Sequence, residues 1–228
     1  MAPPGAKAKA RANLAALDVL AALRDEARPA TSGEQAVLAR WSGWGATPGL
    51  FDDRNDEWAA LRGEVSARLD EPAWAAARRT TLNAHYTPVE VVDAMWTGLR
   101  DLGFDGGRVL EPGCGAGNFI GLAPAGLPVR MVGVELDPTT AAVAQALYPD
   151  AEVRAEGFER TRFPAGYFDA AIGNVPFAKV SLYDPVHNPS KLSLHNHFIV
   201  KSLALTRPGG LVGAVSYTHL TLPTKRIV

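Results

Sequence analysis

The chain has 228 residues, of which 47% are hydrophobic. That is enough for one well-packed α/β domain with a small helical extension, and it leaves no room for a second catalytic domain. With 23 basic and 24 acidic residues, the formal net charge is −1. This balance excludes a strongly positive field over the whole molecule, so any affinity for nucleic acid must be local or come from further parts of the protein.

The cysteine content and the apolar runs bear on the cellular compartment. Cys114 is the one cysteine, which excludes an internal disulfide framework and fits a reducing cytosol. No apolar run approaches the roughly 20 residues of a membrane span, and residues 1–10 lack the apolar core of a signal peptide. We therefore expect a cytoplasmic protein that makes no membrane contact.

The N-terminal part is expected to be helical. Residues 1–10 carry Pro, Gly, Lys and Ala with nothing large to bury, and we expect them to be disordered. A helical extension is expected over residues 11–80, where Thr31 and Glu34 form a capping-box pattern at the start of one helix. The other helices are indicated by apolar residues at helical spacing, namely Leu14, Leu17, Leu20 and Leu23, then Trp58, Leu61, Val65 and Leu69.

Two tryptophans lie in a loop between these helices, in the segment Trp41-Ser-Gly-Trp44-Gly-Ala-Thr-Pro48. They could form a platform on which bases stack. We prefer the interpretation that they pack the helical layer onto the core, because indole rings are mostly buried in folded proteins.

From residue 81 to residue 215 the sequence alternates between helical and short β-rich runs, which is typical of a parallel sheet with crossover helices. Thr87 is expected to cap the first helix, with Pro88 at its first position and Glu90 reaching back to the cap. Strands are expected over Arg108–Glu111, Arg130–Leu136, Ala151–Arg154, Phe168–Ile172 and Leu211–Val215. Helices are expected over Phe119–Leu122, Thr139–Leu147 and His197–Leu205, the last one ended by residues 207–210.

The first strand runs into a glycine-rich turn, Glu111-Pro-Gly-Cys-Gly-Ala-Gly-Asn-Phe119. Such a strand-to-helix turn lets a ligand approach the backbone at the carboxyl edge of a sheet, with Gly113, Gly115 and Gly117 as the close-approach positions. The spacing of dinucleotide-binding proteins would require glycine where this chain has Asn118. The nicotinamide interpretation is therefore disfavoured.

A carboxylate follows the second strand in Val134-Glu135-Leu136-Asp137-Pro138. It lies about 20 residues beyond the glycine turn, where a carboxylate can accept both hydroxyls of a ribose. We assign Glu135 to this role, because Asp137 before a proline is better explained as the N-cap of the next helix.

An ordered series of motifs connects these features: Tyr86-Thr87-Pro88, VLEPGCGAGNF over 109–119, VGVELDP over 132–138 and GNVPF over 173–177. The series resembles class I adenine-N6 DNA methyltransferases in which the cofactor motifs precede the catalytic motif. The likeness is greatest to the methylase part of bacterial methylase–helicase fusion proteins, and it covers roughly residues 11–215. It implies an α/β, Rossmann-like class I methyltransferase sheet, S-adenosylmethionine as the cofactor and DNA as the partner.

The resemblance also implies roles for individual residues. Tyr86 and Thr87 would contact the methionine end of the cofactor, and Glu156 and Phe158 would receive its adenine. Further contacts would come from the glycine turn and the second strand, namely Glu111, Gly113, Gly115, Gly117, Asn118, Phe119, Glu135 and Leu136.

The fourth strand ends in a polar, proline-stiffened tip at Asn174. An adenine amino nitrogen is a poor nucleophile, so catalysis needs acceptors that orient its hydrogens and stabilise developing positive charge. The Asn174 side-chain oxygen and the Val175 main-chain carbonyl can serve, with Pro176 confining Val175 to an extended conformation. The family has proline at position 175, but the role there is a main-chain one. Phe177 would stack on an extruded base, whereas the alternative interpretation of this tip is an ordinary turn.

Three histidines lie close together in the sequence: His187, His195 and His197. Because no cysteine accompanies them and Lys191 lies among them, we expect no metal site, and we expect a polar loop beside the substrate cleft.

After residue 215 the pattern of the fold stops. Residues 216–228 show no helix or hairpin pattern and are expected to be a non-native tail, so the sheet is expected to be truncated after the fifth strand, with recognition and helicase regions missing. Other substrates remain open, namely a protein glutamine side chain or ribosomal RNA. A catalytically silent module of a larger protein is a further alternative.

Overall fold

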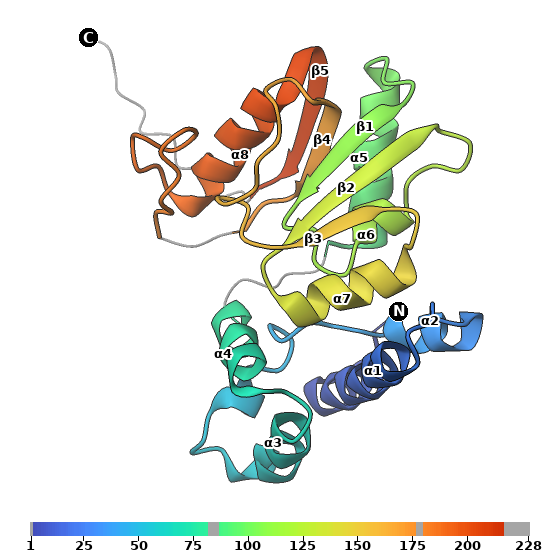
Figure 1. The fold of residues 1–228 in the computed structure, drawn as a ribbon, viewed down its shortest axis with the longest axis vertical. Helices are drawn as coiled ribbons and strands as arrows, with labels where there is room; N and C mark the ends of the chain where they lie inside the picture. Colours follow the sequence, from blue (N-terminus) through green and yellow to red (C-terminus); the bar gives the residue numbers. More distant parts are fainter. Residues whose placement is uncertain (1, 82–86, 177–179, 217–228) are drawn as a thin grey trace.

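The computed structural model describes residues 2–81, 87–176 and 180–216. The protein has two parts, which are an N-terminal group of helices, called the helical layer, and an α/β part built on a parallel sheet. The helical layer comes first in the sequence, and a five-stranded sheet with its own covering helices follows it. Figure 1 shows the helical layer beside α7 (Pro138–Leu147). The helical layer contains four α-helices and two short 3-10 helices, α1 (Ala6–Glu26), α2 (Ser32–Leu38), η1 (Pro48–Phe51), η2 (Asp56–Trp58), α3 (Ala59–Ser66) and α4 (Glu71–Thr80). The expected helical extension is therefore present.

The N-terminal boundary differs from the expectation. We expected residues 1–10 to be disordered, whereas α1 begins at Ala6 and Ala10 is fully buried. Alanine and lysine are strong helix formers, and alanine needs no large side chain to be packed against a neighbour. The capping box of α2 is present as expected, with the Thr31 hydroxyl accepting from the Glu34 N–H and the Glu34 carboxylate accepting from the Thr31 N–H.

The two tryptophans of the 41–48 loop belong to the core of the helical layer. Trp41 and Trp44 are 3% and 1% exposed, and their rings meet edge to face with centroids 5.0 Å apart. Trp44 also packs against Phe51, at 5.8 Å, and the same apolar cluster includes Val143 of α7. The preferred interpretation is confirmed, because the indoles join the helical layer to the α/β part.

The sheet is entirely parallel, with strand order β3-β2-β1-β4-β5. Its strands are β1 (Gly107–Pro112), β2 (Val129–Glu135), β3 (Glu152–Ala155), β4 (Phe168–Asn174) and β5 (Thr206–Val215). All five expected strands are present. β5 starts earlier than expected, because residues 207–210 continue the strand past an irregularity in its pairing with β4 rather than forming a turn after the preceding helix.

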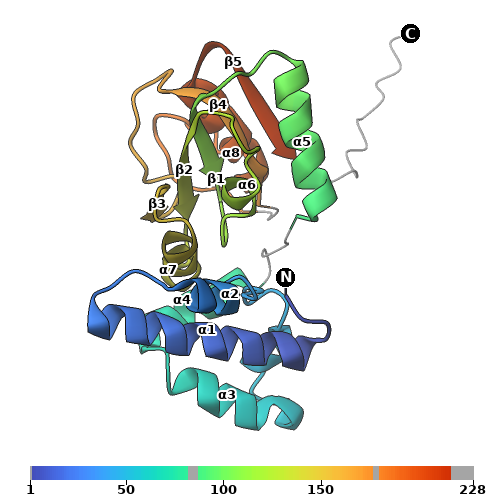
Figure 2. The same cartoon turned by 90° about the vertical axis from the view of Figure 1, so that its right-hand side faces the viewer.

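Both faces of the sheet are buried, as parallel sheets require. On one face α5 (Val89–Asp101), α6 (Asn118–Gly121) and α7 pack against alternate residues such as Val109 and Ala170. α8 (Leu194–Leu205) covers the opposite residues, including Leu110 and Ala171, and the segment around Phe158 extends this cover over β2. Figure 2 shows α5 against its face and the helical layer below the sheet. The α/β architecture is as expected.

The start of α5 corrects one expectation. Pro88 rather than Thr87 precedes the helix, and its carbonyl accepts the first helical N–H groups, from Val91 and Val92. No side chain of the described residues caps this end. Thr87 is instead buried, and its carbonyl accepts a hydrogen bond of 3.3 Å from the Asn118 side chain. Over the described ranges, no helix is long and apolar enough to cross a membrane.

Candidate functional site

A cavity of about 310 Å³ opens at the carboxyl ends of the parallel strands. The tips of β1, β2 and β4 and the turns that follow them reach it, which is where ligands bind in open parallel sheets. Most of the residues proposed from the sequence line this one cavity: Thr87, Glu111, Gly113, Gly115, Asn118, Phe119, Glu135, Leu136, Glu156, Phe158, Asn174, Val175 and Pro176. Tyr86 and Phe177 fall outside the described residues.

The glycine turn brings the main chain to the cavity. Gly113 and Gly115 have positive φ values of 70° and 55°, a conformation that side chains disfavour. A Cβ atom at Gly115 would meet none of the described residues within 4 Å. The Cys114 N–H donates to the Val134 carbonyl, at 2.9 Å, which ties the turn to the end of β2.

Gly117 has a different role from the one we expected. It does not line the cavity. Its φ is 84°, it precedes α6, and a Cβ atom there would lie 2.8 Å from the Tyr148 ring. The backbone conformation and the packing against Tyr148 therefore both favour glycine at this position.

Glu135 is held by the main chain at the end of β2. One carboxylate oxygen accepts from the Gly115 N–H at 2.9 Å, and the other accepts from the Asp137 N–H at 2.8 Å. Each carboxylate oxygen can accept a second hydrogen bond, so both remain able to take a hydroxyl from the cavity. Burial is the largest cause that raises the pKa of Glu135, to about 7, and the main-chain hydrogen bonds act against it.

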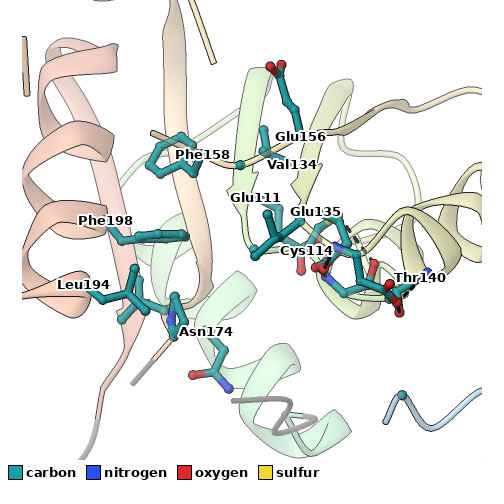
Figure 3. A pocket seen from close by; sticks show the side chains of 18 of the residues that line it. Glu111, Cys114, Val134, Glu135, Thr140, Glu156, Phe158, Asn174, Leu194 and Phe198 are labelled. Carbon is teal, nitrogen blue, oxygen red and sulfur yellow. Dashed lines mark hydrogen bonds between the residues drawn. The ribbon is translucent and has the colours of Figure 1, made fainter. Parts of the chain in front are cut away.

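Asp137 caps α7, as expected. Its carboxylate accepts from the Thr140 N–H at 3.1 Å and from the Thr140 hydroxyl at 2.6 Å, and Pro138 occupies the first turn. Burial raises the pKa of Asp137, while these hydrogen bonds lower it. Figure 3 shows the hydrogen bonds on this side of the cavity, next to Glu135.

Glu111 is a buried acid at the end of β1, and it is 2% exposed. Burial holds its pKa well above the usual range, and N–H groups of Phe119 and Ile120 partly oppose this shift. Its Oε2 atom accepts no hydrogen bond from the described part of the chain. A buried acceptor of this kind, inside a cavity, matches a cationic or N–H donor on a ligand.

Asn174 ends β4 directly beside the glycine turn. A Cβ atom at Gly113 would lie 4.0 Å from the Asn174 carbonyl oxygen and 3.9 Å from Pro176. Val175 is 3% exposed and belongs to the core on the α8 side of the sheet. The tip is thus fixed by packing, and the two motifs that the sequence separates by about 60 residues lie side by side.

Sequence reasoning missed several residues of the cavity. Gly43, Trp44 and Arg79 reach it from the helical layer, and Val180, Leu182, Leu194 and Phe198 reach it from the segment after Asn174. Phe158 and Phe198 pack with ring centroids 4.9 Å apart and form an apolar wall opposite Glu135 (Figure 3). The burial of Trp44 was foreseen, but a core residue that also lines a cavity gives no separate signal in the sequence.

Two of the three histidines contact the same carboxylate, and the third has a different partner. His197 is fully buried, and its Nε2 lies 3.1 Å from Asp184, which His187 also approaches at 3.4 Å. His195 contacts a different residue, because its Nε2 lies 2.9 Å from the Ser216 hydroxyl oxygen. Among the described residues there is no group of three or more histidine, cysteine, aspartate or glutamate side chains that could hold a metal ion.

Comparison with known families identifies the central part of the chain. Residues 110–186 match the model of a family described as a methyltransferase domain, and this range contains the glycine turn, Glu135 and Asn174. This part of the chain is thus similar to a methyltransferase domain. Its fold is the expected Rossmann-like one, and S-adenosylmethionine is its cofactor.

The residues of the cavity fit this cofactor. Glu135 has oxygens that can accept the ribose hydroxyls. The Oε2 of Glu111, which accepts no hydrogen bond from the described residues, suits the ammonium group of a methionine moiety. The apolar ring of Phe158 offers a face for the planar adenine of the cofactor.

Curated proteins that are similar to parts of this chain include the following two. The type II methyltransferase M.TthHB8I of Thermus thermophilus is 37% identical over 138 residues, which is 51% of this chain and 31% of that protein. The defense against restriction protein B of Escherichia phage P1 is 27% identical over 136 residues, which is 58% of this chain and 6% of that protein. The chain thus spans less than a third of the length of either relative.

One solved structure that this chain is similar to is that of CalS10, an amino pentose methyltransferase from Micromonospora echinaspora, with S-adenosylmethionine bound. It has a TM-score of 0.41 and 21% identity, and the match covers 66% of this chain and 59% of that one.

Proposed function

We propose that this domain transfers the methyl group of S-adenosylmethionine to an exocyclic amino group, and that its substrate is N6 of adenine in DNA. The observation that carries the proposal is the position of Asn174. It ends β4 at the cavity, with its main-chain oxygen close to the Gly113 position of the cofactor turn. A methyl acceptor bound at this tip would therefore lie next to the cofactor.

The tip has the groups that an amino nucleophile needs. The Asn174 side-chain oxygen and the Val175 carbonyl would accept the hydrogens of the amine and stabilise the positive charge that grows on it. Holding the amine in line with the reactive carbon replaces a random encounter by a fixed geometry. The bound cofactor supplies the electrophilic methyl group. We propose that the proton leaves to solvent after transfer, since no general base is apparent from the sequence.

An extruded base needs apolar surfaces on both sides. Val175, Leu194 and Phe198 line the described part of the cavity near Asn174. Phe177 lies outside the described residues and is proposed, from its motif alone, as the stacking face. These surfaces suit a planar substrate, and the acceptor pair at the tip suits its amino group.

The relatives support a nucleic-acid substrate and a larger protein. One is named as a type II methyltransferase, and the other, of which this chain spans 6%, is named for defense against restriction. We propose that the domain is the methylase part of a methylase–helicase fusion protein, and that regions beyond residue 215 supply DNA recognition. With a net charge of −1, this chain offers little overall attraction to DNA, which fits such a division of labour.

The proposal is tested by measuring which polymer receives the labelled methyl group from S-adenosylmethionine when the full-length protein is given DNA, RNA or protein. We expect label in DNA, and we expect Asn174→Ala to abolish it while cofactor affinity is retained. Asn196→Ala is the matched control, because Asn196 is an exposed asparagine of α8 that does not line the cavity. Equal loss of transfer and cofactor binding in Asn174→Ala would make Asn174 a cofactor or structural residue.

A further inference from the structure

A buried ionic cluster lies behind the apolar wall of the cavity. Asp184 is 1% exposed, and Lys201 and His197 are fully buried. One Asp184 oxygen accepts from the Lys201 ammonium at 3.0 Å and lies 3.1 Å from His197 Nε2. Although burial raises the pKa of Asp184, the hydrogen bonds from Lys201, from the His187 N–H and from His197 hold it below the usual range. Burial lowers the pKa of Lys201, and its hydrogen bond to Asp184 opposes this shift.

Asp184 organises the segment that follows the catalytic tip. Its other oxygen accepts from the N–H groups of Val186 and His187, at 3.2 and 3.1 Å. The Asp184 carbonyl accepts from the Asn188 N–H at 2.7 Å, and a 2.7 Å hydrogen bond from the Leu194 N–H to the Val180 carbonyl closes the segment. Val180 and Leu194 line the cavity, whereas Asp184 does not. Asp184, which is buried outside the cavity, therefore holds the segment that carries Val180 and Leu194 to the cavity wall.

Lys201 holds a second segment, the one that we assign to the cofactor adenine. Its ammonium donates to the Phe158 carbonyl at 2.6 Å and to the Thr161 carbonyl at 3.2 Å. It also lies 5.0 Å from the centre of the Phe158 ring, which in turn packs on Phe198. Lys201 does not line the cavity, yet it fixes the main chain and the ring of a residue that does. Figure 3 shows Phe158, Phe198 and Leu194 along the same wall.

The cluster is poorly explained by stability alone. Removing charges from water is costly, and well-packed apolar residues often stabilise a core as well as a buried ion pair does. The pair instead connects separate segments of the chain. It joins the 156–161 segment, the 180–194 segment and α8 through hydrogen bonds of fixed direction.

We propose that Lys201 and Asp184 are positioning residues that hold the cofactor side and the target side of the cavity as one unit. Cofactor bound against Phe158 then orders the 180–194 segment before the target arrives. The assignment of that segment to the target rests on the proposed function, whereas the mechanical link between the two segments does not.

The first test compares affinity with stability. Asp184→Asn places an amide donor opposite Lys201 and His197, and Lys201→Met removes the ammonium. We expect each to raise the Kd of S-adenosylhomocysteine, measured by calorimetry, by roughly 2- to 30-fold, the usual range for residues that act on a ligand without touching it. Asp169→Asn is the control, because Asp169 forms a 2.7 Å ion pair with Arg207 and does not line the cavity. It should lower the Tm and leave the Kd unchanged.

The second test uses the wild-type protein, so its result does not depend on whether a variant folds. Hydrogen–deuterium exchange of the full-length wild type is followed with and without S-adenosylhomocysteine, at the amides of Val186, His187 and Asn188. These N–H groups are bonded to Asp184. We expect their exchange to slow when the ligand binds.

The proposal is overturned if Asp184→Asn behaves like Asp169→Asn, with a lower Tm and an unchanged Kd. It is equally overturned if ligand protection stops at residues 156–161 and the amides bonded to Asp184 exchange at the same rate. Neither measurement uses a methyl acceptor, so a failure of the DNA proposal would leave both results standing.

Discussion

Replacing Glu135 by alanine removes the acceptor that we assign to the cofactor ribose. A hydrogen bond to a charged group contributes about 1.5–3 kcal/mol, which corresponds to a roughly 10- to 150-fold loss of affinity. The same substitution frees the Gly115 and Asp137 N–H groups that Glu135 now accepts. Both lie beside an open cavity, where water can replace the carboxylate, so we expect only a modest loss of stability.

The assay is calorimetric titration of S-adenosylmethionine and S-adenosylhomocysteine into the full-length wild type and variant, with the Tm measured in parallel. Glu152→Ala is the matched control, because Glu152 is an exposed acid of the neighbouring strand β3, and its side chain accepts a hydrogen bond from Arg154, two residues along the same strand. Its affinity should equal that of the wild type. If Glu135→Ala retained full affinity in a folded protein, the assignment of Glu135 to the ribose would be refuted.

Three further predictions concern the same cavity. Because the Glu135 pKa is raised from 4.5 to about 7, cofactor affinity should rise between about pH 6 and 8, and binding should release a proton. Calorimetry in buffers of different ionisation enthalpy would detect this proton. The stability that the neutral acid contributes to the fold is present below pH 4.5 and is lost as the pH rises through 7. A pH-independent Kd would contradict this assignment. Gly117→Ala should lower stability by about 1–3 kcal/mol in denaturant unfolding, more than Gly115→Ala, because only Gly117 also has the Tyr148 ring 2.8 Å from its Cβ position; equal losses would show that Tyr148 yields without cost. Phe177→Ala should weaken productive base binding by roughly 1–3 kcal/mol, seen in kcat/KM, while Phe177→Trp retains activity; an unchanged kcat/KM would remove Phe177 from the site.

The local parts of the site could be predicted from the sequence. Asp137 before Pro138 predicts a helix cap, and the structure has it, because the cap depends on a few neighbouring residues only. Gly113, Gly115 and Glu135 line one cavity, as the sequence suggests, because the carboxyl ends of adjacent parallel strands meet at one edge of the sheet. Gly117 shows the limit of this reasoning, because the pattern cannot separate a glycine that faces a ligand from one that faces Tyr148.

The parts that depend on distant contacts were not predictable. Charged residues are usually exposed, so nothing marks Asp184 and Lys201, which are 17 positions apart, as a buried pair. Trp44 and Arg79 reach the cavity only because α1, α2 and α4 pack on α7. The start of α1 was missed because small alanines can be buried without any periodic signal of large apolar side chains.

The central claim, methyl transfer to adenine N6 at the Asn174 tip, is tested most directly by identifying the product. DNA incubated with S-adenosylmethionine and the full-length protein is digested to nucleosides and analysed by mass spectrometry, with Asn174→Ala and Asn196→Ala in parallel. We predict N6-methyldeoxyadenosine from the wild type and from Asn196→Ala, and none from Asn174→Ala. A methylated cytosine in its place, or methylation of RNA or protein with unmodified DNA, would contradict the account.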